Sequence, residues 1–535
     1  MEDCRYIEVI VPLRLSWTPC YRCRVQLRPG QRVTVPVTGR RYVGVVHRTD
    51  ILPDIDPSRI QEISAVNDEL PAVSEEELRF WEFLSSYYLC SIGEVYKAAY
   101  PSGKIRSEQT AAGILERLRQ RLAIREEALT RKHRDNVRER LEQERDAIGA
   151  QIVALTLIPD SAEAVKPSPG KPLLLTGPGR ISRYVSLCRE TVGKGLNVLV
   201  LLPEIAASEQ LQAVFEEHFP GVTHKVNSHM TDARRRAVAE DVRHFGGQIV
   251  TGTRSALFLP LSRLGLVIVE QEQDPYFKQT DPAPRYHARD AAVVLARIHG
   301  AQVVLGTPAP SLESLHNALT GKYIREDLPQ NLPTPVLIDV NAERRKNGMP
   351  GRLSRKLLEA ASRTSGPVAL IRGWEKQEEL AEEAATWLPD RQVDILTPSE
   401  ARLKDLGAYG LVAVVQADAL MNADDFRADE HALQALAQLR ENVRGAFIVQ
   451  TAKTDHPVYG APESVYAQLL EERRQFRLPP YTRLVDTVCG SRRERITLAA
   501  DGTLAARKQE ILERAKQLER TSRGRLRTII DVDPL

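Results

Sequence analysis

Two short polar segments lie between strand-forming runs and helix-forming residues. Both contain residue types that could take part in binding phosphate groups. The first, Gly177 to Ile181 (GPGRI), follows the apolar run LLLT. The second, Glu270 to Gln273 (EQEQ), follows the apolar run LGLVIV. In doubly wound parallel sheets, ligands bind beyond the carboxyl ends of the strands, and glycine-rich turns expose backbone amides to phosphate groups. We therefore expect function to reside in these segments.

A third feature is a cluster of positive charge near the N-terminus. Between residues 9 and 49 there are eight arginines and no acidic residue, although the whole chain carries 74 basic and 71 acidic residues. A cluster of one sign attracts the phosphate backbone of nucleic acids, and such a contact needs only charge and reach. We predict that these arginines bind DNA: Arg14, Arg22, Arg24, Arg28, Arg32, Arg40, Arg41 and Arg48.

The elements that must position these residues form several domains, because 535 residues exceed the size of a single hydrophobic core. Residues 1–103 alternate short apolar runs with turns such as RPG and TG, which predicts a small β-rich domain. A helical stretch within it opens with Ser74 and Glu77 as a capping box. Residues 104–160 are dense in Arg and Glu at helical spacing and predict a shortened helical module.

From residue 172 onward, the pattern is typical of buried strands that alternate with helices. One set of five apolar runs lies in residues 172–330, and a second, shorter set lies in residues 335–455. This alternation predicts an α/β fold with two doubly wound parallel sheets, the second one reduced. A C-terminal segment, residues 456–535, completes the expected architecture.

Composition excludes several classes of protein. No window approaches the roughly 18 apolar residues that a membrane span needs, and the acidic start lacks the features of a signal peptide. We expect a cytoplasmic protein with no membrane partner. Of six cysteines, only Cys20 and Cys23 have the spacing of metal ligands, and no second pair completes a tetrahedral site. We predict no zinc.

A string of longer motifs resembles the first helicase lobe of the PriA family, the superfamily-two helicases of bacterial replication restart. The string is LLPEIA (201–206), GTRSALFLPL (252–261), EQEQDPYFKQ (270–279), RYHARD (285–290) and GTPAPSLES (306–314). The segments at residues 81–103, 416–439, 456–484 and 531–535 resemble further parts of that family. The resemblance implies two RecA-like lobes behind an N-terminal domain that binds a DNA 3′ end, with residues 104–160 as a reduced winged-helix-like region.

The departures from the family pattern fall on the residues that hydrolyse ATP. Where the family has the lysine and threonine of its phosphate loop, this chain has Arg180 and Ile181, after Gly177 and Gly179. Isoleucine offers no oxygen to magnesium. The family box D-E-E-H reads Glu270, Gln271, Glu272 and Gln273 here, and Gln271 cannot act as a base. The paired glycines before the last strand of the second lobe and the zinc insertion are also missing. We predict no intact catalytic residue, no required cofactor and at most residual ATP binding.

Polar residues after the box have two interpretations. Lys278, Arg285, His287 and Arg289 could contact DNA or merely cover the lobe. We interpret Asp274 and Glu313 as structural. We also expect Tyr42, Tyr87 and Tyr88 to be core residues rather than platforms for stacked bases.

The resemblance implies a protein of DNA replication restart that recognises forked or branched DNA, with other primosome or replication proteins as further partners. We predict that it does so without ATP-driven unwinding. Two alternatives remain at this stage: an active ATP-dependent 3′–5′ DNA helicase, and an interaction protein that no longer binds DNA.

Overall fold

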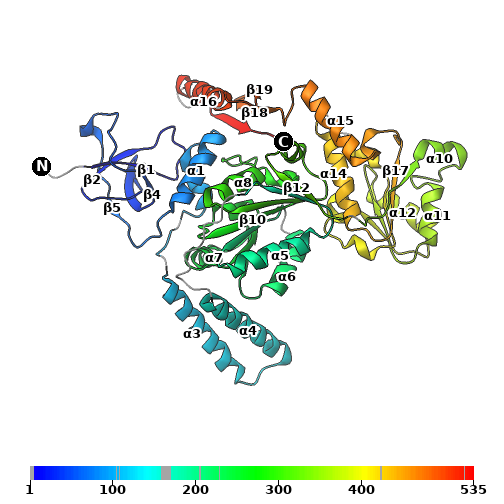
Figure 1. The fold of residues 1–535 in the computed structure, drawn as a ribbon, viewed down its shortest axis with the longest axis horizontal. Coiled ribbons are helices and arrows are strands. Elements are labelled where there is room, and N and C mark those ends of the chain that lie inside the picture. Colours follow the sequence, from blue (N-terminus) through cyan, green and yellow to red (C-terminus); the bar gives the residue numbers. More distant parts are fainter. Residues whose placement is uncertain are drawn as a thin grey trace.

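The computed structural model of the chain describes residues 5–103, 105–107, 109–157, 170–203, 207–227, 229–329, 331–421, 425–522 and 525–535. Residues 204–206, from the LLPEIA motif, and residues 422–424 lie outside the described residues. In the described residues, four sheets make up the framework. Figure 1 shows the N-terminal sheet at one end and the second lobe at the other, with the C-terminal elements returning to the middle.

The N-terminal region is an antiparallel sheet followed by two helices. Its strand order is β2-β1-β4-β3-β5. The TG turn joins β3 to β4 with positive φ at both Thr38 and Gly39, the backbone that suits a two-residue hairpin. The predicted capping box is present, since Glu77 N donates to Ser74 Oγ and Ser74 N donates to Glu77. The elements are β1 Arg5–Ile10, β2 Cys20–Cys23, β3 Arg32–Val37, β4 Arg40–Arg48, β5 Ala65–Val66, α1 Glu75–Tyr87 and α2 Ile92–Ala99.

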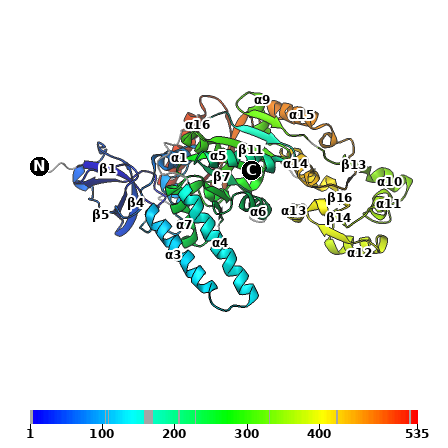
Figure 2. The ribbon, with the colours of Figure 1, turned by 60° about the horizontal axis from the view of Figure 1, so that its bottom comes forward.

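The next module is a hairpin of two long helices, α3 Ala111–Leu129 and α4 Asp135–Leu157. Ile114, Leu118, Ile148 and Leu155 form its apolar seam and pack on Phe245 of the following lobe. The hairpin projects from the body of the molecule (Figures 1 and 2). Within the described part of 104–160 there is no strand, and the expected helical module is a hairpin of two helices. Apolar residues at helical spacing and few strand formers explain this outcome.

The first lobe is a seven-stranded, fully parallel sheet with the order β12-β6-β11-β10-β7-β9-β8. Apolar residues on both sides of its strands are buried, with α5 and α6 on one face and α7 and α8 on the other. Its elements are β6 Leu173–Thr176, α5 Arg180–Gly193, β7 Asn197–Leu201, α6 Ala207–His218, β8 Thr223–Val226, α7 Asp232–His244, β9 Ile249–Gly252, β10 Leu264–Glu270, α8 Ala288–His299, β11 Gln302–Thr307, α9 Leu312–Leu319 and β12 Ile324–Asp327.

The second lobe repeats this design on a smaller scale, with a parallel sheet in the order β13-β17-β16-β14-β15. The α/β fold class predicted from the sequence is therefore confirmed. The elements are β13 Val336–Asp339, α10 Val340–Lys346, α11 Arg355–Arg363, β14 Val368–Ile371, α12 Gln377–Trp387, β15 Val393–Leu396, α13 Pro398–Ala401, β16 Leu411–Val414, α14 Ala428–Glu441 and β17 Ala446–Thr451.

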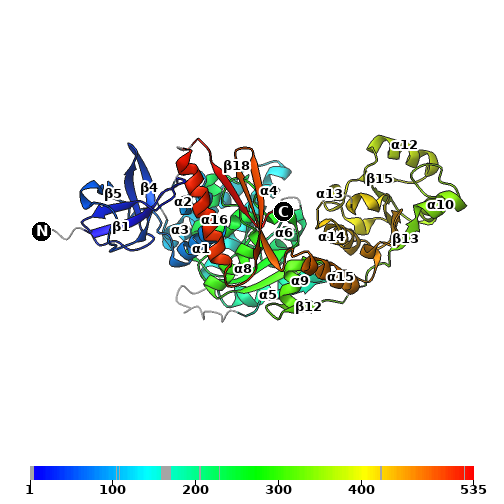
Figure 3. The same ribbon diagram turned by 90° about the horizontal axis from the view of Figure 1, so that it is seen from above.

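The C-terminal segment is a folded unit that returns to the first half of the chain. After α15 Pro462–Gln475 comes an antiparallel sheet, β19-β18-β20, covered by α16 Leu504–Thr521. Its strands are β18 Thr482–Cys489, β19 Arg492–Ala499 and β20 Thr528–Val532. Val532 and Ala515 share one buried core with Phe80 of α1 and Ala292 of α8. Figure 3 shows α16 lying across the junction between the N-terminal region and the first lobe.

In the described part of the chain, no helix is both long and apolar enough to cross a membrane.

Lys508 provides a test of the contact between α16 and α1. Its ammonium lies 3.4 Å from the centroid of the Tyr87 ring, and burial lowers its pKa to about 8. In the unfolded chain the pKa returns to its ordinary value near 10.5, so the unfolded state binds more protons between these pH values and stability rises with pH. We expect the free energy of unfolding of the wild type to gain roughly 2 kcal/mol over that of Lys508→Met between pH 8 and 9.5.

Urea denaturation at a series of pH values measures this difference. Parallel pH profiles for the two proteins would contradict the burial of Lys508.

Candidate functional site

The GPGRI segment forms the turn between β6 and α5. Gly177 and Gly179 have φ of +92° and +87°, a backbone region that favours glycine. A Cβ on Gly177 would lie 2.7 Å from the carbonyl oxygen of Leu328. The strand-to-helix turn expected from the sequence is therefore present, at the carboxyl edge of the parallel sheet.

Arg180, at the first position of α5, turns its side chain back into this edge and is 5% exposed. Its Nε and Nη2 donate to the two carboxylate oxygens of Glu270, at 3.2 and 2.7 Å. Its Nη1 donates to the carbonyl oxygen of Gly177 at 2.7 Å. Nη1 and Nη2 also donate to the carboxylate of Glu441, which belongs to α14 of the second lobe. The guanidinium thus occupies the space between the turn and the second lobe.

Glu270 ends β10 and is held from a second side. The hydroxyl of Tyr184 donates to its Oε2 at 2.5 Å, and Gly306 leaves the room for that ring, because a Cβ there would lie 1.5 Å from the hydroxyl oxygen. Burial by itself would raise the pKa of Glu270, but the charge of Arg180, together with the hydrogen bonds from Arg180, Tyr184 and the backbone of Gln271, lowers the pKa below its usual value. Glu270 is therefore a carboxylate committed to an internal ion pair.

The remaining box residues also bind protein groups. Gln271, with φ of +56°, accepts a hydrogen bond at 2.8 Å from Gln438 of α14. Glu272 is fully buried, pairs with Arg289 at 3.0 Å and accepts from Ser311 and Ser314. Gln273 accepts from the Thr307 hydroxyl at 2.7 Å. The box now joins strands, helices and lobes to one another.

Three of the four polar residues predicted after the box are structural rather than exposed to DNA. Lys278 is 2% exposed, and its ammonium donates to the carbonyl oxygens of Arg285 and Val532 and pairs with Asp531. Arg289 is buried against Glu272. Burial lowers the pKa of His287 to about 3, which leaves its ring neutral near pH 7. The prediction of DNA contact is corrected for these three, because their charge is either neutralised inside the protein or absent.

Asp274, Tyr87 and Tyr88 make internal contacts. Asp274 caps the turn that starts at Pro275 and pairs with Arg402 of the second lobe at 3.0 Å. Tyr88 is 1% exposed, and the Tyr87 hydroxyl donates to Asp533 at 2.8 Å.

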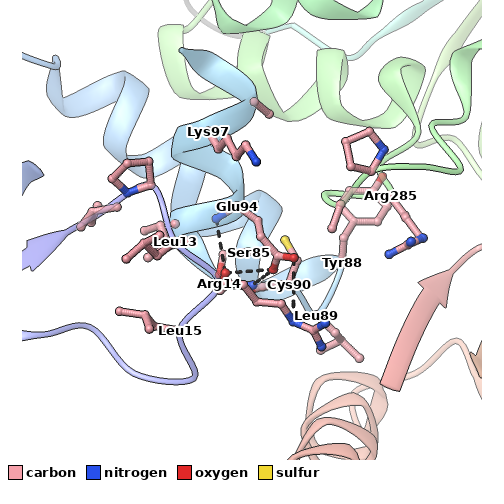
Figure 4. Close-up of a pocket in the computed structure, with 18 of the residues that line it drawn as sticks. Leu13, Arg14, Leu15, Ser85, Tyr88, Leu89, Cys90, Glu94, Lys97 and Arg285 are labelled. Carbon is pink, nitrogen blue, oxygen red and sulfur yellow. Dashed lines mark hydrogen bonds and ion pairs between the residues drawn. The ribbon is translucent and has the colours of Figure 1, made fainter. Parts of the chain in front are cut away.

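A cleft of about 1760 Å³ opens where the N-terminal region, the first lobe and the C-terminal unit meet. Figure 4 shows Leu13, Arg14 and Leu15 on one wall, Glu94 and Lys97 of α2 behind them, and Arg285 on the far side. The lining holds seven Lys and Arg side chains and five Asp and Glu side chains. Arg14 pairs with Glu519, and Arg285 pairs with Asp281. Five further cations line the cleft: Arg48, Lys97, Arg235, Lys516 and Arg527.

The structure divides the predicted arginine cluster. Arg14 and Arg48 line the cleft, whereas Arg22, Arg24, Arg28, Arg40 and Arg41 are exposed elsewhere on the N-terminal sheet. Arg32 is 1% exposed, donates to Pro71 O and Tyr96 Oη, and lies over the Tyr100 ring, so its prediction as a DNA contact is corrected. Lys97, Arg235 and Lys516 were missed, because they lie on three helices that are far apart in the chain. The exposed Trp17, on the same lining, was also missed.

In the described residues, no group of three or more His, Cys, Asp and Glu side chains could hold a metal ion. Cys20 and Cys23, the pair with ligand-like spacing, lie on β2, and the thiol of Cys23 donates to the carbonyl oxygen of Val25 at 3.4 Å.

Comparison with known proteins connects these sites to a family. Residues 8–101 match the model of the PriA 3′DNA-binding domain (3′BD). The replication restart protein PriA of Rickettsia conorii is 29% identical over 347 residues, which cover 63% of this chain and 48% of the relative. That of Chlamydia pneumoniae is 37% identical over 178 residues, covering 32% and 24%. The chain belongs to the PriA family.

The chain spans about half or less of the length of these PriA relatives. Among solved structures, RecG bound to a three-way DNA junction is similar over 83% of this chain and 66% of RecG, with a TM-score of 0.35 and 15% identity. Dbp5 of S. cerevisiae bound to RNA and ADP BeF3 is similar over 61% and 90%, with a TM-score of 0.35 and 11% identity. The residues matched to the PriA 3′DNA-binding domain supply one wall of the cleft.

Arg289 tests the structural role of the residues after the box. Arg289→Met leaves the carboxylate of Glu272 buried without its partner, so we expect the free energy of unfolding to fall by about 3 to 5 kcal/mol. Arg297→Met, at an exposed position of the same helix, should change it by about 0.5 kcal/mol or less.

Urea denaturation monitored by circular dichroism measures both variants. An Arg289→Met protein with wild-type stability but weakened binding to fork DNA would instead support the original DNA-contact prediction.

Proposed function

We propose that this chain is a PriA-type DNA-binding protein of replication restart that takes forked or branched DNA into the basic cleft and does not unwind it with ATP. The observation that carries the proposal is the composition of the cleft. The region matched to the PriA 3′DNA-binding domain, which includes Lys97 of α2, forms a wall that faces cations of α16 and of the segment before β20. Cations on several walls suit a phosphate backbone that passes between them.

The cleft favours nucleic acid over a small apolar ligand. It is wide and open to solvent, and Arg48, Lys97 and Arg527 on its lining are exposed. Apolar side chains such as Leu13 and Trp17 lie among these charges. Bases and phosphates together need this mixture, because bases stack on apolar surfaces while phosphates need cations.

The altered nucleotide site supports the second half of the proposal. Magnesium ATP does not fit the residues present: Ile181 offers no oxygen ligand, Gln271 is no base, and the side chain of Arg180 fills the edge where phosphates would lie. A phosphate placed there would also meet the carboxylates of Glu270 and Glu441. No catalytic step is therefore derived for this site.

A salt titration tests the DNA cleft. We expect the triple variant Arg48→Met, Lys97→Met, Arg527→Met to lose affinity for a model fork and to reduce the slope of log K against log salt by about 3, one unit for each lost phosphate contact. The matched control is Arg22→Met, Arg40→Met, Arg41→Met, which removes three exposed cations of the predicted cluster that do not line the cleft.

Fluorescence anisotropy with a labelled fork at several salt concentrations measures both slopes. Loss of binding in the control alone would place the DNA on the outer face of the sheet, and absence of wild-type binding at low salt would refute the DNA-binding proposal.

Phosphate release tests the absence of hydrolysis. We expect the purified chain with fork DNA to release no more phosphate from ATP than a blank without protein. The double variant Arg180→Lys, Ile181→Thr should remain inactive, because Gln271 still lacks a basic oxygen. An intact helicase assayed in parallel is the positive control. A turnover rate of this chain near that of the control would contradict this part of the proposal.

A further inference from the structure

The first and second lobes meet along the altered nucleotide site. Three polar contacts cross the boundary beside the former catalytic positions: Arg180 with Glu441, Gln271 with Gln438, and Asp274 with Arg402. Farther along α14, the Glu430 carboxylate accepts from the backbone N–H of Leu312 at 2.9 Å. In Figure 1, α14 is the element of the second lobe that lies toward the first.

The contact of Arg180 differs from the others in that it uses the whole guanidinium. Two of its hydrogen bonds go to Glu270 of the first lobe and two go to Glu441 of the second, and one more reaches Gly177 O. The side chains of Arg180, Glu270 and Glu441 are only 5, 12 and 12% exposed, so water screens their charges weakly. One buried cation therefore joins two carboxylates from different lobes.

The close approach of Glu270 and Glu441 depends on the positive charge of Arg180. Glu270 and Glu441 would repel each other across the boundary if the guanidinium did not lie between them. Burial raises the pKa of Glu441, and the charge of Arg180 opposes that rise. Lysine, with one compact ammonium, could not supply paired hydrogen bonds to two carboxylates in this arrangement.

We propose that Arg180, Glu270 and Glu441 form an interlobe clamp that holds the two lobes in one arrangement without nucleotide. The substitution that removes the phosphate-binding lysine also supplies the cation of the clamp. Gln271 and Gln438 extend the same contact with a neutral hydrogen bond. The clamp does not depend on DNA binding, and its failure would leave the proposed function of the cleft untouched.

Charge reversal in the full-length chain tests the clamp. Glu441→Arg places a second guanidinium against Arg180, so we expect the lobes to separate. The radius of gyration from small-angle X-ray scattering should rise, and amides of residues 270–274 and 436–441 should exchange hydrogen roughly tenfold faster or more. Glu441→Gln, which keeps an acceptor without the charge, should show a smaller change in the same direction. Glu378→Gln, at an exposed position of α12 in the same lobe, is the matched control and should resemble the wild type.

The result that would overturn the clamp is a Glu441→Arg protein with wild-type scattering and wild-type exchange at these segments. If that variant loses its helical circular dichroism, Glu441→Gln decides by the same two measurements. Millimolar magnesium ATP should leave the wild-type exchange pattern unchanged, and a nucleotide-dependent change at residues 270–274 would also overturn the clamp.

Discussion

The arrangement of the two lobes depends on one buried guanidinium shared by two carboxylates. Arg180 leaves the turn after β6, meets Glu270 at the end of β10 and reaches Glu441 at the end of α14. A buried charge is stable only when it is paired and hydrogen-bonded, and here every guanidinium nitrogen has an acceptor. The side chain that fills the edge of the first sheet thus also joins the two lobes.

The same principle explains the polar character of the box. Glu272 is fully buried and accepts hydrogen bonds from Arg289, Ser311 and Ser314. Gln273 satisfies Thr307, and Gln271 satisfies a glutamine of the other lobe. Unsatisfied buried polar groups are costly, so the residues of the box are constrained by their hydrogen-bond partners.

Much of the fold was predictable because buried parallel strands are continuous apolar runs. The five apolar runs of residues 172–330 are all strands, namely β6, β7, β9, β10 and β11. The sequence did not reveal β8 (THKV) and β12 (IRED), since edge strands are half exposed and carry polar residues. The C-terminal sheet was missed for a similar reason, because half of the residues of β19 (RRERITLA) are charged.

The position of the site could be predicted from the sequence, but the contacts of its residues could be predicted only in part. The turn at Gly177 and the box at Glu270 do face one edge of the sheet, whereas the pairing of Arg180 with Glu441 joins residues far apart in the chain that no local pattern connects. Burial of Arg32, Lys278 and Arg289 could not be inferred from charge, because the acceptors that make burial tolerable come from other elements.

Because the walls of the cleft come from distant parts of the chain, the cleft forms late in folding. One wall comes from residues near position 14 and another from α16 and β20, and Arg14 bonds directly to Glu519 and Thr528. Contacts between such distant segments close some of the longest loops in the chain, which makes them slow steps of folding. In a partly folded molecule the cations of the lining are therefore present, but the cleft is not. The cleft is complete only when the segment around Arg14 has packed against α16 and β20.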